Sequence, residues 1–187
     1  MADFEKAFKI LKNLEFKNCK NALHKNKGEN GYTFMGIYQK AHPNALIWKE
    51  LERYKIILGE TEPLKELSRL LCHNVHALKD VRDIYKREYW DKARLDDVKS
   101  QKIAEEIFVF GVNAGIENAI KAAQRLVGVI DDGIVGPKTL KALNSHNGKL
   151  FDILFDAEEA KYYESLISAK KRFAVFEDGW LNRAKAV

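Results

Sequence analysis

The stretch that decides the fold of this chain is a turn and helix start at residues 131–144, which read DDGIVGPKTLKALN. Asp132 and Gly133 predict a tight turn in which the glycine takes a positive φ angle. Gly136 allows the backbone to approach a neighbour closely, and Pro137 has the fixed φ angle that suits the first position of a helix. The segment therefore predicts a turn that leads directly into a helix.

The predicted helix carries Leu140 and Leu143 three residues apart, and so on one face. With the turn before it, the segment resembles the DG-x-x-G-x-x-T-x-x-AL signature of small peptidoglycan-binding repeats. The resemblance implies a helical module whose partner is the bacterial cell wall.

Composition places the chain among soluble globular proteins. It has 187 residues, of which 46% are hydrophobic and 32% charged, and no stretch approaches the apolar length that crosses a bilayer. The N-terminus lacks the basic and apolar regions of a secretory signal peptide. We therefore expect synthesis in the cytoplasm, with activity in the periplasm or cell wall after holin-type release or dedicated secretion.

The chain is basic, with a formal net charge of +5. Such a charge favours an anionic partner, which can be nucleic acid, a membrane or a polyanionic wall, although a solvated surface is an equally weighted alternative. No nucleic-acid recognition motif, P-loop or dinucleotide fingerprint is present, so we expect no specific nucleic-acid binding. Cys19 and Cys72 form no metal motif. We expect no cofactor, no metal and a monomer; reduced thiols are favoured, and a disulfide stays open.

Hydrophobic periodicity predicts mostly helices. Residues 3–15 form an amphipathic helix, with an apolar stripe at Phe4, Ala7, Phe8, Leu11 and Leu14. Residues 16–44 lose this period and form a long polar loop, in which Tyr32 to Tyr38 suits a short strand or turn. Helical periodicity resumes after Pro63 with Leu64, Leu67, Leu71, Val75 and Leu78, and continues in further helices. The fold class is mostly α with one small irregular or β-like segment.

Glu15 is the candidate general acid. It ends the first predicted helix, where the partial negative charge of the helix carbonyls and the apolar neighbours Leu14 and Phe16 disfavour an ionised carboxylate. A glycosidase needs a carboxylic acid that still holds its proton beside the leaving oxygen. The alternative is an ordinary exposed glutamate at a helix end.

The following loop supplies candidates for the other catalytic groups. Glu29 can stabilise positive charge at the sugar or act as a base, and Thr33 can hold a water through its hydroxyl group. The alternative is a turn in which Glu29 is solvated and Thr33 bonds its own backbone.

Five sequence blocks, in order along nearly the whole chain, resemble the muramidases of glycoside hydrolase family 108, which occur among phage and prophage endolysins. The blocks are the helix-end glutamate, the loop at 30–37 (NGYTFMGI), the segment at 84–92 (IYKREYWDK), the stretch from Val112 to Arg125, and the Asp-Gly signature with the closing motif at 179–183 (GWLNR). The resemblance implies Glu15 as the acid and Thr33 as the loop threonine.

The resemblance also implies the architecture and the activity. A lysozyme-like catalytic lobe would occupy residues 1–111, and a helical peptidoglycan-binding region packed against it would occupy residues 112–187. The substrate would be the peptidoglycan glycan strand, cleaved at the β-1,4 bond between N-acetylmuramic acid and N-acetylglucosamine. Two alternatives stay open: a lytic transglycosylase, and a non-catalytic wall-binding or secretion-associated protein on the same scaffold.

The chain departs from the family pattern at several positions. Phe16 and Lys17 replace the usual Gly-Gly after the glutamate, and no aspartate stands between Glu15 and Thr33. Val109 occupies a position where the family often has aspartate. The stretch from 43 to 80 is longer than usual, which suggests an added helix pair. These departures motivate the non-catalytic alternative.

Four further residues are candidates for substrate binding. Tyr32, Tyr38 and Trp90 can stack on sugar rings, although a place in the aromatic core is at least as consistent with Trp90. Asn113 can bond an acetamido group or satisfy the backbone at a helix break. A cluster of lysines near the loop can steer an anionic polymer or be simply solvated, and comprises Lys17, Lys20, Lys25 and Lys27. The loop histidines His24 and His42 lack metal-ligand spacing.

Overall fold

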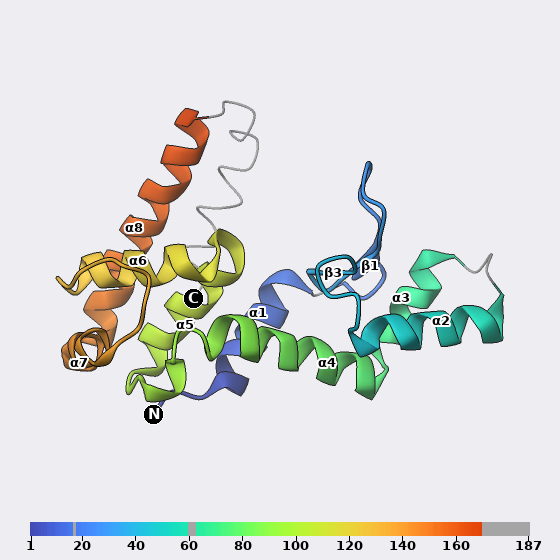
Figure 1. Ribbon diagram of the computed structural model, residues 1–187, viewed down its shortest axis with the longest axis horizontal. Helices are drawn as coiled ribbons and strands as arrows, with labels where there is room; N and C mark the ends of the chain where they lie inside the picture. The colour runs from blue at the N-terminus through green and yellow to red at the C-terminus, as the bar shows by residue number, and fades with distance from the viewer. Residues whose placement is uncertain (17, 60–62, 170–187) are drawn as a thin grey trace. The chain divides into compact units, whose positions relative to one another are not determined.

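The computed structural model describes residues 1–16, 18–59 and 63–169 (Figure 1). The described part is mostly helical with one small antiparallel sheet, which confirms the predicted fold class. In chain order the elements are α1 (Phe4–Glu15), β1 (Leu23–His24), β2 (Thr33–Phe34), β3 (Ile37–Tyr38), α2 (Leu46–Leu58), α3 (Leu64–Cys72), α4 (Val75–Tyr85), the π-helical η1 (Lys86–Trp90), the 3-10 helix η2 (Leu95–Asp97), α5 (Gln101–Ala114), α6 (Ile116–Leu126), α7 (Pro137–Ser145) and α8 (Gly148–Ala169). Lys17 and the closing motif at 179–183 lie outside the described residues.

The chain divides into two compact units. One comprises residues 11–85, and the other comprises residues 1–10 together with the chain from residue 86 onward. The predicted division after residue 111 stays a prediction. None of the described helices combines the length and the apolar character that a membrane span requires.

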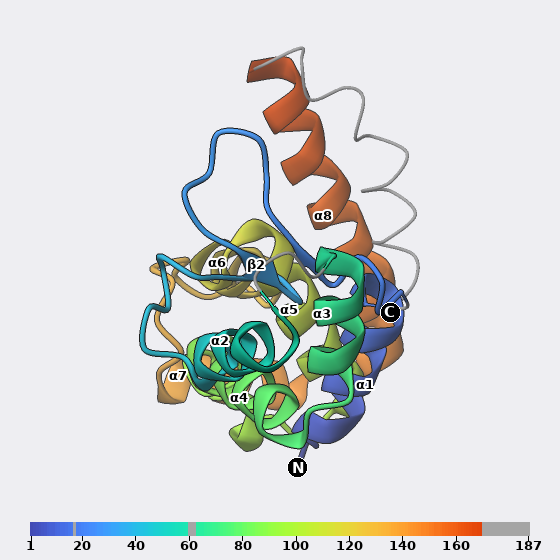
Figure 2. The same ribbon diagram turned by 90° about the vertical axis from the view of Figure 1, so that its right-hand side faces the viewer.

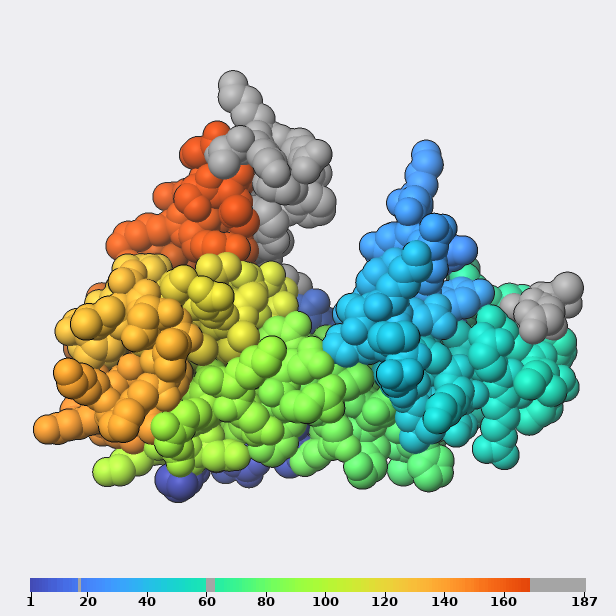
Figure 3. All heavy atoms as spheres, in the orientation of Figure 1, coloured from blue at the N-terminus to red at the C-terminus, as the bar shows by residue number. Residues whose placement is uncertain are grey.

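The unit of residues 11–85 contains helices α2, α3 and α4 and the three-stranded sheet. The strands follow the order β1-β2-β3, and His24 pairs with Thr33, which in turn pairs with Tyr38. The loop between β1 and β2 projects as a narrow finger (Figures 1 and 3). The strand or turn predicted between Tyr32 and Tyr38 is therefore confirmed as the β2–β3 hairpin. The loop prediction missed β1.

Two positive φ angles close the β2–β3 hairpin. Met35 has a φ of 45° and Gly36 a φ of 77°, as a two-residue turn of the primed type requires. The buried hydroxyl group of Tyr85, at the end of α4, donates a hydrogen bond of 2.9 Å to the carbonyl oxygen of Met35. Helix α4 therefore fixes the position of the turn.

One predicted helix is two helices in the structure. The periodicity from Leu64 to Leu78 predicts a continuous helix, which was wrong, because the chain breaks between α3 and α4. Asn74 caps α4: its Oδ1 accepts a hydrogen bond of 2.9 Å from the Ala77 N–H. Its amide nitrogen donates to Glu50 at 2.8 Å and to Tyr54 at 3.0 Å, both on α2. The side chain of Asn74 thus connects the break between α3 and α4 to α2.

The other unit is built around α5. Helices α6 and α8 pack against α5, and α8 extends beyond them as one long helix (Figure 2). An aromatic cluster joins the start of α1 to α5 and η1: the ring centroid of Phe4 lies 5.5 Å from that of Trp90 and 5.7 Å from that of Phe108. The apolar stripe predicted for residues 3–15 is accordingly buried at Phe4, Ala7, Phe8 and Leu11.

The segment at 131–144 forms the predicted turn and helix. Gly133 has a φ of 78°, and Pro137 occupies the first turn of α7. A buried side chain from α6 organises the turn. The Gln124 amide oxygen accepts a hydrogen bond of 2.8 Å from the Gly133 N–H, and its nitrogen lies 2.8 Å from Asp132 Oδ1 and 3.2 Å from Thr139 Oγ1. One amide therefore holds the turn to the start of the next helix.

A completely buried glutamate lies between α5 and α8. The carboxyl group of Glu106 faces Lys102 on its own helix and three acidic residues of α8, which are Asp152, Asp156 and Glu159. Burial, reinforced by Asp152, raises the pKa of Glu106 to about 9. The side chain is therefore protonated in the folded protein at neutral pH.

This raised pKa predicts a pH dependence of stability. Between about pH 4.5 and about pH 9, the unfolded chain releases the Glu106 proton while the folded protein keeps it, so rising pH favours unfolding. The effect approaches about 1.4 kcal/mol per pH unit. In Glu106→Gln the neutral amide removes this titration. We expect urea unfolding to show that Glu106→Gln is more stable relative to wild type at pH 8 than it is at pH 5. Parallel pH profiles for the two proteins would contradict the assignment.

Candidate active site

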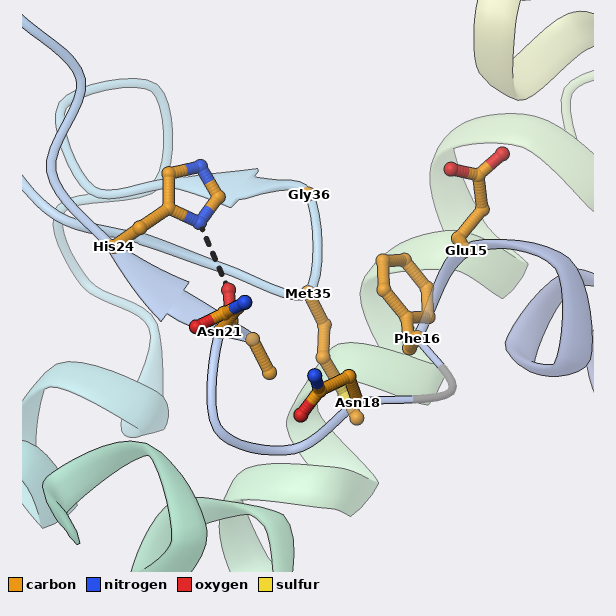
Figure 4. Close-up of a pocket in the computed structure, with 8 residues that line it drawn as sticks. Glu15, Phe16, Asn18, Asn21, His24, Met35 and Gly36 are labelled. Atoms are coloured by element: carbon orange, nitrogen blue, oxygen red, sulfur yellow. Dashed lines mark hydrogen bonds between the residues drawn. The ribbon is translucent and has the colours of Figure 1, made fainter. Parts of the chain in front are cut away.

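Glu15 is the last residue of α1 and lies at a pocket of about 290 Å³ (Figure 4). The residues that line the pocket come from the end of α1, the link to β1, β1 itself and the β2–β3 turn. They are Glu15, Phe16, Asn18, Asn21, Ala22, His24, Met35 and Gly36. The pocket lies entirely within the unit of residues 11–85. A half-buried carboxyl group at a pocket is where a general acid can meet a substrate.

Phe16 forms part of the pocket wall beside Glu15. Its ring centroid lies 6.3 Å from that of Tyr85. Both rings pack where Gly36 has no side chain: a Cβ added there would lie 2.5 Å from the Tyr85 hydroxyl oxygen and 3.8 Å from Phe16. The departure from Gly-Gly at this position thus adds an aromatic wall. In Figure 4 the Glu15 carboxyl group points away from the Phe16 ring.

Ser68 of α3 anchors the link between Phe16 and β1. Its buried hydroxyl group donates to the carbonyl oxygen of Cys19 and accepts a hydrogen bond of 2.8 Å from the Leu23 N–H. Cys72 lies nearby, with its sulfur 3.9 Å from the same carbonyl oxygen. Burial raises the pKa of the Cys72 thiol to about 12. Cys19 and Cys72 are free thiols, as the sequence analysis favoured.

His24 follows this anchored link, on strand β1. Its Nδ1 lies 3.3 Å from the carbonyl oxygen of Asn21. Because a carbonyl oxygen only accepts hydrogen bonds, Nδ1 is the donor in this contact, and in the neutral ring Nε2 is the atom with the lone pair. The ring is half-buried and lines the pocket. In Figure 4, Glu15 and His24 stand on either side of Gly36.

Glu29 and Thr33 belong to the same unit but do not line the pocket. Glu29 lies in the loop between β1 and β2, where its Oε2 accepts a hydrogen bond of 3.1 Å from the Asn26 amide. Its backbone N–H bonds the Asn26 carbonyl oxygen, which closes a turn. Thr33 is buried on β2, paired with His24. Their catalytic roles stay predictions.

The two candidate tyrosines lie near the sheet. Tyr32 is half-buried, and the Lys55 ammonium group lies 4.7 Å from its ring centroid. Tyr38 is half-buried on β3, close to Gly31. Both keep partly exposed rings that a sugar can contact. The loop lysines in the described part, Lys20, Lys25 and Lys27, are exposed.

Trp90 and Asn113 belong to the other unit. The Trp90 side chain is completely buried, and its Nε1 donates a hydrogen bond of 2.8 Å to Asp96. A buried ring offers no face to a sugar, so the structure corrects the stacking role and favours the core alternative. Asn113 is exposed near the end of α5, and its amide lies 3.4 Å from the Val109 carbonyl oxygen, as expected for a residue that satisfies a helix end.

One group of carboxylates within the described residues is close enough to hold a metal ion. Oxygens of Glu106, Asp152 and Asp156 lie within 4.8 Å of one another. The Lys102 ammonium group already supplies positive charge there, 3.3 Å from Glu106 and 3.0 Å from Asp152. The lysine therefore neutralises part of the negative charge of this internal cluster.

Sequence reasoning missed most of the pocket lining. Asn18, Asn21 and Met35 were not candidates, and His24 was considered only as a metal ligand. The signal that could have found His24 is the apolar pair Ala22-Leu23 before it, in an otherwise polar loop. Such a pair indicates a point where the loop is anchored to the core, and the polar residue that follows it is then held in place.

A carboxylic acid at a pocket is one part of a glycoside-cleaving site, which in most such enzymes pairs two carboxylates. The second titratable side chain at this pocket is His24. The family model described as "Glycosyl hydrolase 108" matches residues 22–115, and that described as "Predicted Peptidoglycan domain" matches residues 118–185. The chain belongs to glycosyl hydrolase family 108, as its sequence motifs predicted. It is a glycosidase that acts on peptidoglycan and carries a predicted peptidoglycan-binding domain.

A solved structure with the same fold is that of Brucella abortus SagA. The two chains share 21% sequence identity with a TM-score of 0.65, over 97% of this chain and 89% of that one. No curated protein sequence matches the chain. The matched glycosidase range includes His24, Glu29 and Thr33 and begins after Glu15.

Proposed function

We propose that this protein is a muramidase that hydrolyses the β-1,4 bond between N-acetylmuramic acid and N-acetylglucosamine, and that it serves as a phage or prophage endolysin. The observation that carries the proposal is the position of Glu15 at the pocket of a family 108 glycosidase. There its carboxyl group protonates the glycosidic oxygen as the bond breaks. The region from residue 118 onward binds the wall polymer.

The surroundings of Glu15 suit a polar sugar chain. Asn18 and Asn21 bring amide groups to the pocket, and amides bond both hydroxyl and acetamido groups. Met35 and Phe16 bring apolar surface that can contact a sugar face. The formal net charge of +5 favours approach to an anionic wall.

We propose that the protein acts in the periplasm or cell wall, reached by holin-type release or by a dedicated secretion machine. The location of its substrate supports this proposal, because peptidoglycan lies outside the cytoplasm. If cells that express the protein lyse only when a holin is co-expressed, the endolysin route is supported. Lysis that does not depend on the holin would contradict it.

The proposed reaction is tested by the masses of its products. Purified Gram-negative peptidoglycan is incubated with the protein, and the soluble muropeptides are identified by mass spectrometry. We expect muropeptides that end in a reducing N-acetylmuramic acid. Anhydro products, which form without an attacking water, would instead identify a lytic transglycosylase.

The alternative function is a protein that binds the cell wall without catalysis. The Phe16 ring, which stands where the family usually has glycine, favours this alternative. It predicts that the protein pellets with insoluble peptidoglycan while releasing no muropeptides. Co-sedimentation measured beside the digestion therefore separates the two functions.

A further inference from the structure

Hydrolysis requires an attacking water as well as an acid. In an inverting glycosidase a second group takes the proton of that water on the face of the sugar opposite the acid. Among the described residues that line the pocket, Glu15 and His24 are the titratable ones. The neighbouring Asn18 and Asn21 carry amides, which cannot accept a proton at neutral pH.

The geometry of His24 suits a base. Its Nδ1–H donates to the carbonyl oxygen of Asn21 at 3.3 Å, which holds the ring and leaves Nε2 as the basic atom. The backbone that carries it is anchored by Ser68 through the hydrogen bond from the Leu23 N–H and by pairing with Thr33. A base held by its other nitrogen is oriented before the substrate arrives.

Glu29, the carboxylate that could serve as the base instead of His24, lies elsewhere in the unit. Glu29 is held in the β1–β2 loop by Asn26 and does not line the pocket. Thr33 can position a water but has no basic atom that accepts a proton at neutral pH. Of the described residues that line the pocket with Glu15, His24 is therefore the one that can accept the proton of the water.

We propose, on the basis of the function above, that His24 is the general base of an inverting muramidase. Nε2 takes a proton from water while the water oxygen bonds the anomeric carbon. The bond from that carbon to the glycosidic oxygen breaks, and Glu15 gives its proton to the leaving oxygen. Afterwards His24 is protonated and Glu15 is ionised, and exchange with solvent restores both groups. The β-linked substrate yields a product whose new reducing end is α.

The variant His24→Asn tests the proposal. The asparagine amide can still donate to the Asn21 carbonyl oxygen but offers no basic nitrogen. We expect kcat on soluble glycan strands to fall by about 10²- to 10⁴-fold, with KM and the melting temperature changed little. The matched control is His76→Asn, because His76 is exposed on α4 of the same unit and does not line the pocket. A kcat for His24→Asn within threefold of wild type would overturn the proposal, as would a large loss in Glu29→Gln with none in His24→Asn.

The stereochemistry of the wild-type product gives a second test that needs no variant. Proton NMR during the first minutes of hydrolysis should show the α anomer before mutarotation. The β anomer would overturn the role of His24 and leave the hydrolysis of peptidoglycan intact, whereas an anhydro product would contradict the proposed hydrolysis itself. If wild type releases no muropeptides at all, the proposed function itself fails, so the two failures are distinguishable.

Discussion

Glu15→Gln is expected to lower kcat for muropeptide release by about 10²- to 10⁴-fold, because the amide keeps the shape of the carboxyl group and cannot give a proton to the leaving oxygen. Glu15 ends α1 at the pocket. The variant should still pellet with insoluble peptidoglycan, since the predicted peptidoglycan domain at residues 118–185 is unchanged. Release of muropeptides is measured by the rate at which new reducing ends form.

A matched control for this variant is Glu66→Gln. Glu66 is partly exposed on α3 of the same unit and forms a surface ion pair with Arg69 at 2.6 Å. Surface ion pairs of this kind contribute little to stability, so the control should fold normally and keep wild-type activity. Activity of Glu15→Gln equal to that of the control would remove Glu15 from the reaction.

Gly36→Ala is expected to lower the free energy of unfolding by about 2–4 kcal/mol and to abolish activity. Gly36 has a φ of 77°, and an added Cβ would lie 2.5 Å from the Tyr85 hydroxyl oxygen. The methyl group therefore adds backbone strain and breaks the hydrogen bond from Tyr85 to Met35. Because the turn lines the pocket beside Glu15, its displacement also disturbs the site. Urea unfolding measures the first effect and muropeptide release the second.

Gly28→Ala separates backbone strain from the clash. Gly28 has a φ of 87°, but nothing lies within 4 Å of an added Cβ. Gly28→Ala should therefore lower the free energy of unfolding by only about 1–2 kcal/mol. Tyr85→Phe combined with Gly36→Ala should recover part of the lost stability, because the oxygen that meets the new methyl group is gone. Equal costs for the two alanine variants, with no recovery by Tyr85→Phe, would contradict the tight fit of the turn against α4.

Local patterns predicted the elements that depend on neighbours in the sequence. The stripe of α1, the hairpin near Thr33 and the turn at Gly133 follow from periodicity and from residues with special φ angles. The family resemblance rested on motifs of this local kind. The position of Glu15 at the end of α1 was predicted by the same reasoning, because a helix end is visible in the sequence. Its catalytic role stays a prediction.

Features that depend on distant partners could not be predicted in this way. The break at Asn74 depends on Glu50 and Tyr54 of another helix, and strand β1 depends on Ser68, 45 residues away from Leu23. The place of His24 at the pocket depends on both the anchored link and the β1–β2 pairing. Trp90 looked equally suited to a sugar groove and to the core, and only the packing of Phe4 and Phe108 around it decides between them.

The most direct test of the central claim is digestion of one preparation of peptidoglycan by wild type and Glu15→Gln side by side, with the products identified by mass spectrometry. We predict reducing muropeptides from wild type and none from Glu15→Gln, with both proteins bound to the wall. Wild type that binds the wall and releases nothing, or a Glu15→Gln variant that releases the same products at the same rate, would contradict the account.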